Sequence, residues 1–135
     1  MTIELLVATM DQEDFSIVDK MNIQTDAIIV NQCNTNDYEV LTFRDHTIKL
    51  MSFNERGIGL SRNTALMRAT SDICMIADDD MILVEGYAEK VINEFKRFPK
   101  ADVILFSLQS LNKKRPLRRI VRSEQINRFQ ALKYG

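Results

Sequence analysis

The feature that most constrains the fold is a short apolar run, residues 73–77, which ends in three consecutive carboxylates, Asp78, Asp79 and Asp80. An apolar run of this length between polar neighbours is typical of a strand that is buried on both faces of a sheet. In an open α/β sheet, ligands bind beyond the carboxyl ends of the strands. The run therefore predicts a buried parallel strand whose acidic end lies where a ligand would bind.

The three adjacent carboxylates need a physical explanation. Two unit charges ~4 Å apart repel by roughly 4 kcal/mol at an effective dielectric constant near 20. Such groups shift their pKa values, extend into water or hold a cation. Carboxylate oxygens suit Mg²⁺ or Mn²⁺, and Mg²⁺ usually shares its coordination with substrate phosphates. Two interpretations follow: a solvated acidic turn, or a divalent-cation site with Asp80 and Asp78 as ligands.

A glycine-containing loop with Gly57 and Gly59 precedes the acidic run and leads into a predicted helix over residues 60–69. The amino terminus of a helix carries free N–H groups and a partial positive charge, which favour a diphosphate. The two glycines alone do not form a phosphate-loop motif. Arg62, in the first turn, would neutralise phosphate, brace the aspartates or form a surface salt bridge.

The rest of the chain alternates between strand-like and helix-like patterns. We expect strands over residues 3–9, 27–30 and 101–108. We expect three further helices: one capped by Asp11, one over 85–98 that stops before Pro99, and a short one from Ser123. Residues 38–43 and 47–53 should form a hairpin with His46 in its exposed turn. Strands that alternate with helices predict an α/β sandwich with a mainly parallel central sheet.

Residues 59–80 resemble part of a known enzyme family. Arg62-Asn63, the polar break at residues 70–72, the strand at 73–77 and Asp78-Asp79-Asp80 follow one another in the order found in the nucleotide-sugar-binding half of family 2 glycosyltransferases, which have the GT-A fold. The chain resembles that family more loosely over residues 3–110. The resemblance implies a metal-dependent, inverting transfer of sugar from a nucleotide-diphospho-sugar to a glycan or lipid-linked acceptor, in surface polysaccharide synthesis.

The resemblance also implies site residues. The residues that would bind the donor are Thr9, Asn31, Arg56, Arg62, Asp78 and Asp79. Asp80 and Asp78 would bind the cation, Mn²⁺ or Mg²⁺. Thr9 and Asn31, at the ends of the first two strands, would flank the nucleoside. The family usually has an acidic residue at the end of the second strand, which contacts the base. Asn31 and Gln32 stand there instead, so the base identity stays open.

The family's catalytic base lies beyond the metal motif. After Asp102 the only acidic residue is Glu124, and no matching motif surrounds it. The catalytic residue is therefore unknown and expected outside this chain. We expect a GT-A fold truncated after its donor-binding half: residues 1–110 form the nucleotide-sugar-binding domain, and residues 111–135 form a basic segment and short helix that begin a missing acceptor-binding part. We therefore expect this chain to bind the sugar donor but to show weak or absent transfer of the sugar.

Charge is unevenly distributed along the chain. Residues 101–135 carry a net charge of +6 and residues 1–100 carry −7, with six Lys or Arg residues in the run 113–122. The run is either a solvated loop or a surface for phosphates, an acidic acceptor or an anionic membrane. No nucleic-acid partner is expected, because no aromatic side chains interleave these charges.

Composition supports an ordinary globular chain, with 45% hydrophobic and 27% charged residues. No apolar run approaches the ~20 residues of a membrane span, and no signal pattern begins the sequence. Cys33 and Cys74 lack metal-site spacing and are expected to be free thiols. We therefore expect a cytoplasmic protein, in peripheral contact with the inner membrane face, and a homodimer formed through an exposed apolar surface.

Two alternative functions remain. A non-catalytic nucleotide-sugar-binding or regulatory module of the same fold would explain the missing base. A phosphoacceptor receiver domain needs an acidic pair at the end of its first strand, where this chain has Thr9, Met10 and Asp11. The receiver interpretation is therefore disfavoured.

Overall fold

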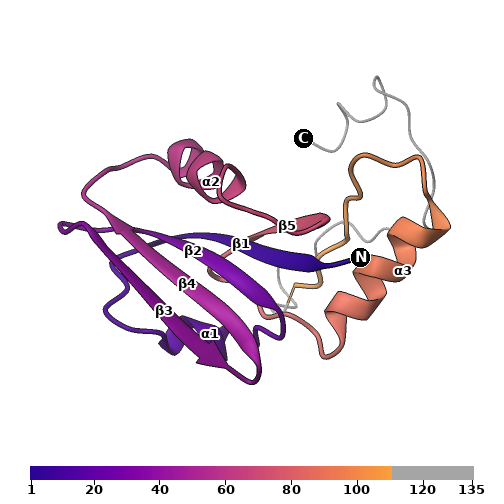
Figure 1. The fold of residues 1–135 in the computed structure, drawn as a ribbon, viewed down its shortest axis with the longest axis horizontal. Helices are drawn as coiled ribbons and strands as arrows, with labels where there is room; N and C mark the ends of the chain where they lie inside the picture. Colours follow the sequence, from indigo (N-terminus) through magenta and orange to yellow (C-terminus); the bar gives the residue numbers. More distant parts are fainter. Residues whose placement is uncertain (111–135) are drawn as a thin grey trace. The chain divides into compact units, whose positions relative to one another are not determined.

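The computed structural model describes residues 1–110 (Figure 1). Its elements are β1 (Ile3–Met10), α1 (Ser16–Lys20), β2 (Asp26–Gln32), β3 (Asp37–Phe43), β4 (His46–Phe53), α2 (Ile58–Leu66), β5 (Ile73–Asp78) and α3 (Tyr87–Arg97). The chain divides into two compact units, Met1–Asn93 and Glu94–Gly135, and the whole sheet belongs to the first.

The sheet has five strands in the order β3-β4-β2-β1-β5. β1 pairs in parallel with β2 and β5, and β2 pairs in parallel with β4. Only β3 is antiparallel, to β4. The predicted α/β class with a mainly parallel sheet is confirmed. The carboxyl ends of the parallel strands β1, β2, β4 and β5 lie along one side of the sheet, which we call the carboxyl edge.

Both faces of the central strands are buried, which explains their continuous apolar sequences. Leu5 and Val7 of β1 face a cluster that includes Ile17 and Val18 of α1. Leu6 faces the opposite way, into a smaller cluster with Ala65 of α2. Helices α1 and α2 therefore lie on opposite faces of the sheet (Figure 1).

Two local expectations near the sheet were wrong. Asp11 does not cap the first helix: it has φ 51 and its N–H bonds the carbonyl of Gln32 at 2.9 Å. The helix begins at Ser16, whose N–H donates to Asp14 Oδ1 at 2.8 Å. The hairpin is confirmed, but its turn is Arg44-Asp45. His46 is the first, half-buried residue of β4.

The predicted strand over residues 101–108 is absent, and this expectation was wrong. The segment has no regular structure, and most of its apolar side chains are exposed, with Val103 75% and Leu105 56% accessible. An apolar run becomes a strand only when another strand accepts its backbone hydrogen bonds. Residues 94–110 contain no strand to pair with it.

Some expectations fall outside the described residues. These are the basic run at 113–122 and the helix expected from Ser123. Within residues 1–110, no helix combines the length and the apolar character that crossing a bilayer requires. Cys33 and Cys74 are free, as predicted.

Candidate functional site

The three carboxylates at the end of β5 have different surroundings. Asp78 forms an ion pair and hydrogen bond with Arg62. Asp79 Oδ2 accepts a 2.6 Å hydrogen bond from Thr9 Oγ1. Asp80 is exposed and has no hydrogen bond or ion pair to any described residue. The turn is closed by Met81 N–H, which donates to the Asp78 carbonyl at 3.2 Å. The separate partners relieve the repulsion that the sequence implied and leave Asp80 available.

Arg62 reaches the acidic turn from α2. Its side chain is 40% accessible and that of Asp78 is 44% accessible, so solvent screens the pair and its contribution to stability is under about 1 kcal/mol. The Nε atom of Arg62 is buried and bonds nothing among the described residues. The guanidinium therefore braces Asp78 and keeps an unused donor.

Asn31, at the end of β2, is fully buried with 0% accessibility. Its Oδ1 accepts from Gln12 N–H at 3.0 Å, and its Nδ2 donates to the Gln12 carbonyl at 2.9 Å and to Ser52 Oγ at 3.0 Å. Both amide hydrogens are thus in use. Asn31 fixes the backbone of Gln12, and because its side chain is buried with both amide hydrogens bonded, it cannot contact a ligand directly.

Gln12 was not singled out in the sequence, although it occupies a central place. Its Nε2 donates to Thr9 Oγ1 at 3.0 Å and to the Met10 carbonyl at 3.1 Å. Hydrogen bonds therefore run without a break along the carboxyl edge, from the turn after β5 to β4. We call this chain the polar row; its members are Asp79, Thr9, Gln12, Asn31 and Ser52.

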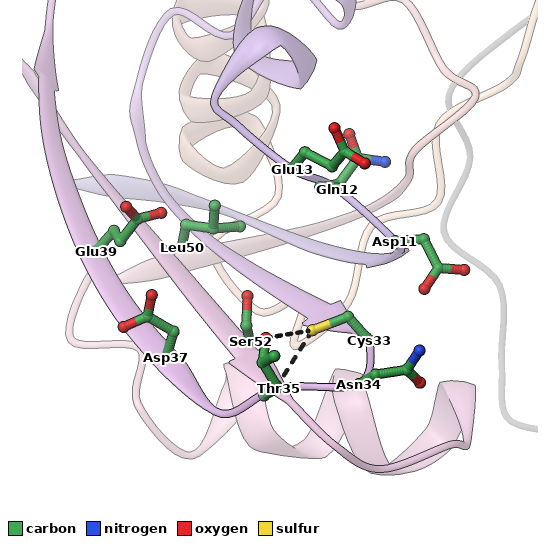
Figure 2. Close-up of a pocket in the computed structure, with 10 residues that line it drawn as sticks. All are labelled: Asp11, Gln12, Glu13, Cys33, Asn34, Thr35, Asp37, Glu39, Leu50 and Ser52. Carbon is green, nitrogen blue, oxygen red and sulfur yellow. Dashed lines mark hydrogen bonds between the residues drawn. The ribbon is translucent and has the colours of Figure 1, made fainter.

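A hollow of about 420 Å³ opens beside the polar row (Figure 2). Its lining residues come from the segment after β1, the loop after β2, and strands β3 and β4: Asp11, Gln12, Glu13, Cys33, Asn34, Thr35, Asp37, Glu39, Leu50 and Ser52. Hydrogen bonding to Thr35, first through its hydroxyl and then through its backbone, lowers the pKa of the Cys33 thiol. The lining is mostly polar and offers many hydrogen-bond acceptors.

Arg56 lies at one side of this hollow. Its Nη1 donates to the Gln32 carbonyl at 3.0 Å and its Nη2 to Asn34 Oδ1 at 3.2 Å, while Nη1 lies 3.7 Å from Asp11 Oδ1. The next residue, Gly57, has φ 143, which favours glycine, and its N–H bonds Gln32 Oε1 at 2.5 Å. Gln32 thereby ties the entry of α2 to the end of β2.

Comparison with known proteins agrees with this geometry. The family model described as Glycosyl transferase family 2 matches residues 16–134, which is most of the chain. The chain belongs to this family. No curated protein and no solved structure gives a match. Its sheet and helices are those of a GT-A-like domain of a family 2 glycosyltransferase.

In this family 2 glycosyltransferase, the residues expected to bind the donor are grouped along the carboxyl edge. Thr9 contacts Asp79, and Arg62 contacts Asp78. Asn31 lies opposite Thr9 on the neighbouring strand, and its side chain is linked to Thr9 by hydrogen bonds through Gln12. Arg56 stands at the hollow and has no hydrogen bond or ion pair to Asp78, Asp79 or Asp80. Gln12 could have been suspected because it follows β1 by two residues, but nothing in its sequence neighbourhood reveals its bonds.

Members of the family often use a divalent cation. Residues 1–110 contain no group of three or more His, Cys, Asp or Glu side chains that could hold a metal ion. Mg²⁺ needs only one or two carboxylates when substrate phosphates complete its shell. The unpaired Asp80, with Asp78 nearby in the same turn, fits this donor set.

Proposed function

We propose that this glycosyltransferase binds a nucleotide-diphospho-sugar along the carboxyl edge and transfers its sugar, with inversion, to a glycan or lipid-linked acceptor. The observation that carries the proposal is the polar row, which joins the hollow to the acidic turn and ends beside the unpaired Asp80. A ligand with a nucleoside at one end and a diphosphate at the other matches this layout.

Each expected residue has a role in this proposal. Thr9 and Asn31 would shape the nucleoside end, Asn31 through its hold on Gln12. Arg56 and Arg62 would face the phosphates, and Asp79 the sugar or ribose. Asp80 and Asp78 would hold Mn²⁺ or Mg²⁺, and a bound cation would neutralise charge on the departing diphosphate.

The transfer itself is a substitution at the anomeric carbon. The acceptor oxygen forms a bond to that carbon, the bond to the diphosphate oxygen breaks, and the nucleoside diphosphate leaves with the electron pair. The acceptor proton passes to a carboxylate base, for which residues 1–110 offer no assigned candidate. We therefore expect weak or absent transfer by the 135-residue chain, and a non-catalytic nucleotide-sugar-binding or regulatory module is the second candidate.

Further parts of the proposal concern location and partners. A cytoplasmic position against the inner membrane face, with the basic run 113–122 in contact with anionic lipid, would suit surface polysaccharide synthesis. A homodimer is proposed because apolar side chains are exposed at the end of α2, just after it and on β5: Leu66 is 49%, Met67 85% and Ile76 50% accessible. Sedimentation of a strictly monomeric species at high concentration contradicts the dimer.

A thermal-shift experiment tests the proposed function. Each nucleoside diphosphate is added with and without Mn²⁺ at about 100 times its Kd, where binding stabilises the folded state by about 2.7 kcal/mol. We expect a shift only when metal and nucleotide are both present, and its loss in Asp80→Asn. Glu89→Gln, which removes an exposed carboxylate of α3, is the matched control. A shift that is unchanged in Asp80→Asn contradicts the proposal.

A further inference from the structure

We propose that the outer edge of β3 pairs with the same strand of a second copy of this chain, so that two sheets join into one across a two-fold axis. β3 is the outermost strand of the sheet, and among the described residues only β4 pairs with it (Figure 1). The strand lies at the opposite end of the sheet from β5. The inference is independent of donor binding, and it names a surface other than the apolar side chains of α2 and β5.

The edge of β3 lacks several features that usually protect an edge strand. Such strands are kept from pairing by Pro, by Lys, by a bulge or by a very short length. β3 contains neither Pro nor Lys, and its register with β4 runs without a bulge from Asp37 to Phe43. Tyr38 and Val40 are 55% and 53% accessible. The strand is therefore long, regular and exposed enough to accept another strand.

The turn of the hairpin determines which backbone groups of β3 face outward. Both residues of the turn Arg44-Asp45 have positive φ, 48 and 67, as in the two-residue turns that favour hairpins. The flanking residue Phe43 therefore bonds β4, and the hydrogen-bonded positions alternate along the strand from there. The residues whose N–H and C=O groups face outward are then Tyr38, Val40 and Thr42. The N–H of Tyr38 agrees with this, because it donates to Asp37 Oδ1 at 2.8 Å.

A two-fold axis at Val40 allows all of these outward groups to form hydrogen bonds. Val40 then lies opposite the partner's Val40, and Tyr38 lies opposite the partner's Thr42. Three opposed pairs that each exchange two bonds give about six hydrogen bonds. The N–H of Tyr38 exchanges its bond to Asp37 for a bond to the partner, and the Asp37 carboxylate is released.

Charge selects this register over the two neighbouring ones. An axis moved to Glu39 sets that carboxylate directly against its own copy, and an axis moved to Leu41 sets Asp37 against the partner's Asp45. Like charges directly opposite one another destabilise a strand pair. With the axis at Val40, no like charges lie directly opposite, and the two copies of Glu39 are only diagonal neighbours.

The same register also brings opposite charges together. Asp37 lies opposite the partner's Phe43, and the guanidinium of Arg44 stands 5.0 Å from the centroid of the Phe43 ring in its own chain. The released carboxylate of Asp37 therefore meets the partner's Arg44, once on each side of the axis. The edge is complementary to itself in both backbone and charge, which is why the occupant is a second copy of this chain.

Sedimentation equilibrium of the 135-residue chain over a series of concentrations tests the inference. We expect a monomer–dimer equilibrium, and Val40→Pro should raise its Kd roughly tenfold or more, because two hydrogen bonds at the axis lose their donors. Proline fits an edge strand where the N–H side faces outward, so the variant should keep the circular dichroism of the wild type. Val40→Thr retains the N–H and is the matched control, with a Kd within about threefold of the wild type.

Exchange of charge between Asp37 and Arg44 tests the register. Asp37→Lys and Arg44→Glu each set like charges together at both ends of the strand pair, so each variant alone should associate several-fold more weakly than the wild type. An equal mixture of the two variants should associate more tightly than either alone, because both contacts of a mixed pair again join opposite charges. High salt should reduce these differences.

The outcomes separate this surface from the apolar side chains of α2 and β5. Met67→Lys should leave the Kd unchanged. A strictly monomeric wild type, an unchanged Kd in Val40→Pro, or a mixture of the charge variants no tighter than each alone overturns the inference. Loss of association in Met67→Lys with wild-type association in Val40→Pro also overturns it and assigns the dimer to α2 and β5. None of these results bears on donor binding, which the thermal-shift experiment tests.

Discussion

Replacement of Asn31 by alanine should be the most damaging polar substitution at the carboxyl edge. The side chain has 0% accessibility and makes three hydrogen bonds of 2.9 to 3.0 Å to Gln12 and Ser52. A hydrogen bond contributes a net ~1 kcal/mol, so Asn31→Ala should lower the free energy of unfolding by about 3 kcal/mol. For a chain of this size, the melting temperature should fall by about 10 °C.

Asn31→Asp distinguishes hydrogen bonding from packing, because the carboxylate has nearly the same shape. It can still accept from Gln12 N–H, but it has no hydrogen to donate and sets a negative charge against the Gln12 carbonyl. We expect it to be at least as destabilised as the alanine variant.

Urea unfolding followed by circular dichroism measures both variants. Asn93→Ala is the control, because Asn93 is exposed on α3 and its loss should change stability by less than about 0.5 kcal/mol. Both Asn31 variants should also bind nucleotide more weakly, since Gln12 is no longer held. Wild-type stability in Asn31→Ala refutes the idea that the buried amide organises this edge.

Three further predictions concern single side chains. Arg62→Ala should cost under about 1 kcal/mol of stability, because its pair with Asp78 is exposed, yet it should weaken Mn²⁺-dependent nucleotide binding in calorimetry by roughly tenfold. Tyr87→Phe should destabilise by about 1–2 kcal/mol in urea unfolding, because it removes a buried 2.6 Å hydrogen bond to Thr25, without affecting nucleotide binding. Hydrogen bonds from the Thr2 backbone and then its hydroxyl lower the pKa of Asp72, so its stabilisation is present above about pH 4 and lost as pH falls. Asp72→Asn should therefore lose less stability than the wild type between neutral and acidic pH.

Each of these has a contradicting result. Unchanged nucleotide affinity in Arg62→Ala would remove that residue from the site. Nucleotide affinity that falls in Tyr87→Phe would show that α3 and the start of β2 influence the carboxyl edge. An identical loss of stability with acid in Asp72→Asn and the wild type would show that other carboxylates dominate acid unfolding.

The sheet was largely predictable because its central strands are buried on both faces. Leu5, Val7 and Ile28 belong to continuous apolar runs, and few other structures bury such runs completely. The acidic end of β5 was equally visible, since a ligand-binding edge follows from strand direction alone. The hairpin followed from alternation, although its turn is one residue shorter than expected, because β4 begins at His46.

The structural features that the sequence did not predict depend on contacts between segments that are distant along the chain. The run at 101–108 has the composition of a strand, but composition does not reveal whether a partner strand is present. Asn31 stands where the resemblance places a ligand contact, and only its bonds to Gln12 and Ser52 show that it is closed to solvent. The importance of Gln12 likewise comes from its hydrogen bonds to the ends of two strands, β1 and β2.

The central claim is that the acidic turn after β5 holds a divalent cation against the diphosphate of the donor. The most direct measurement is anomalous diffraction at the manganese edge from crystals soaked with Mn²⁺ and a nucleoside diphosphate. The account predicts one strong peak between the Asp80 carboxylate and the diphosphate oxygens. A nucleotide bound with no peak at that turn, or a peak at another surface, would contradict it.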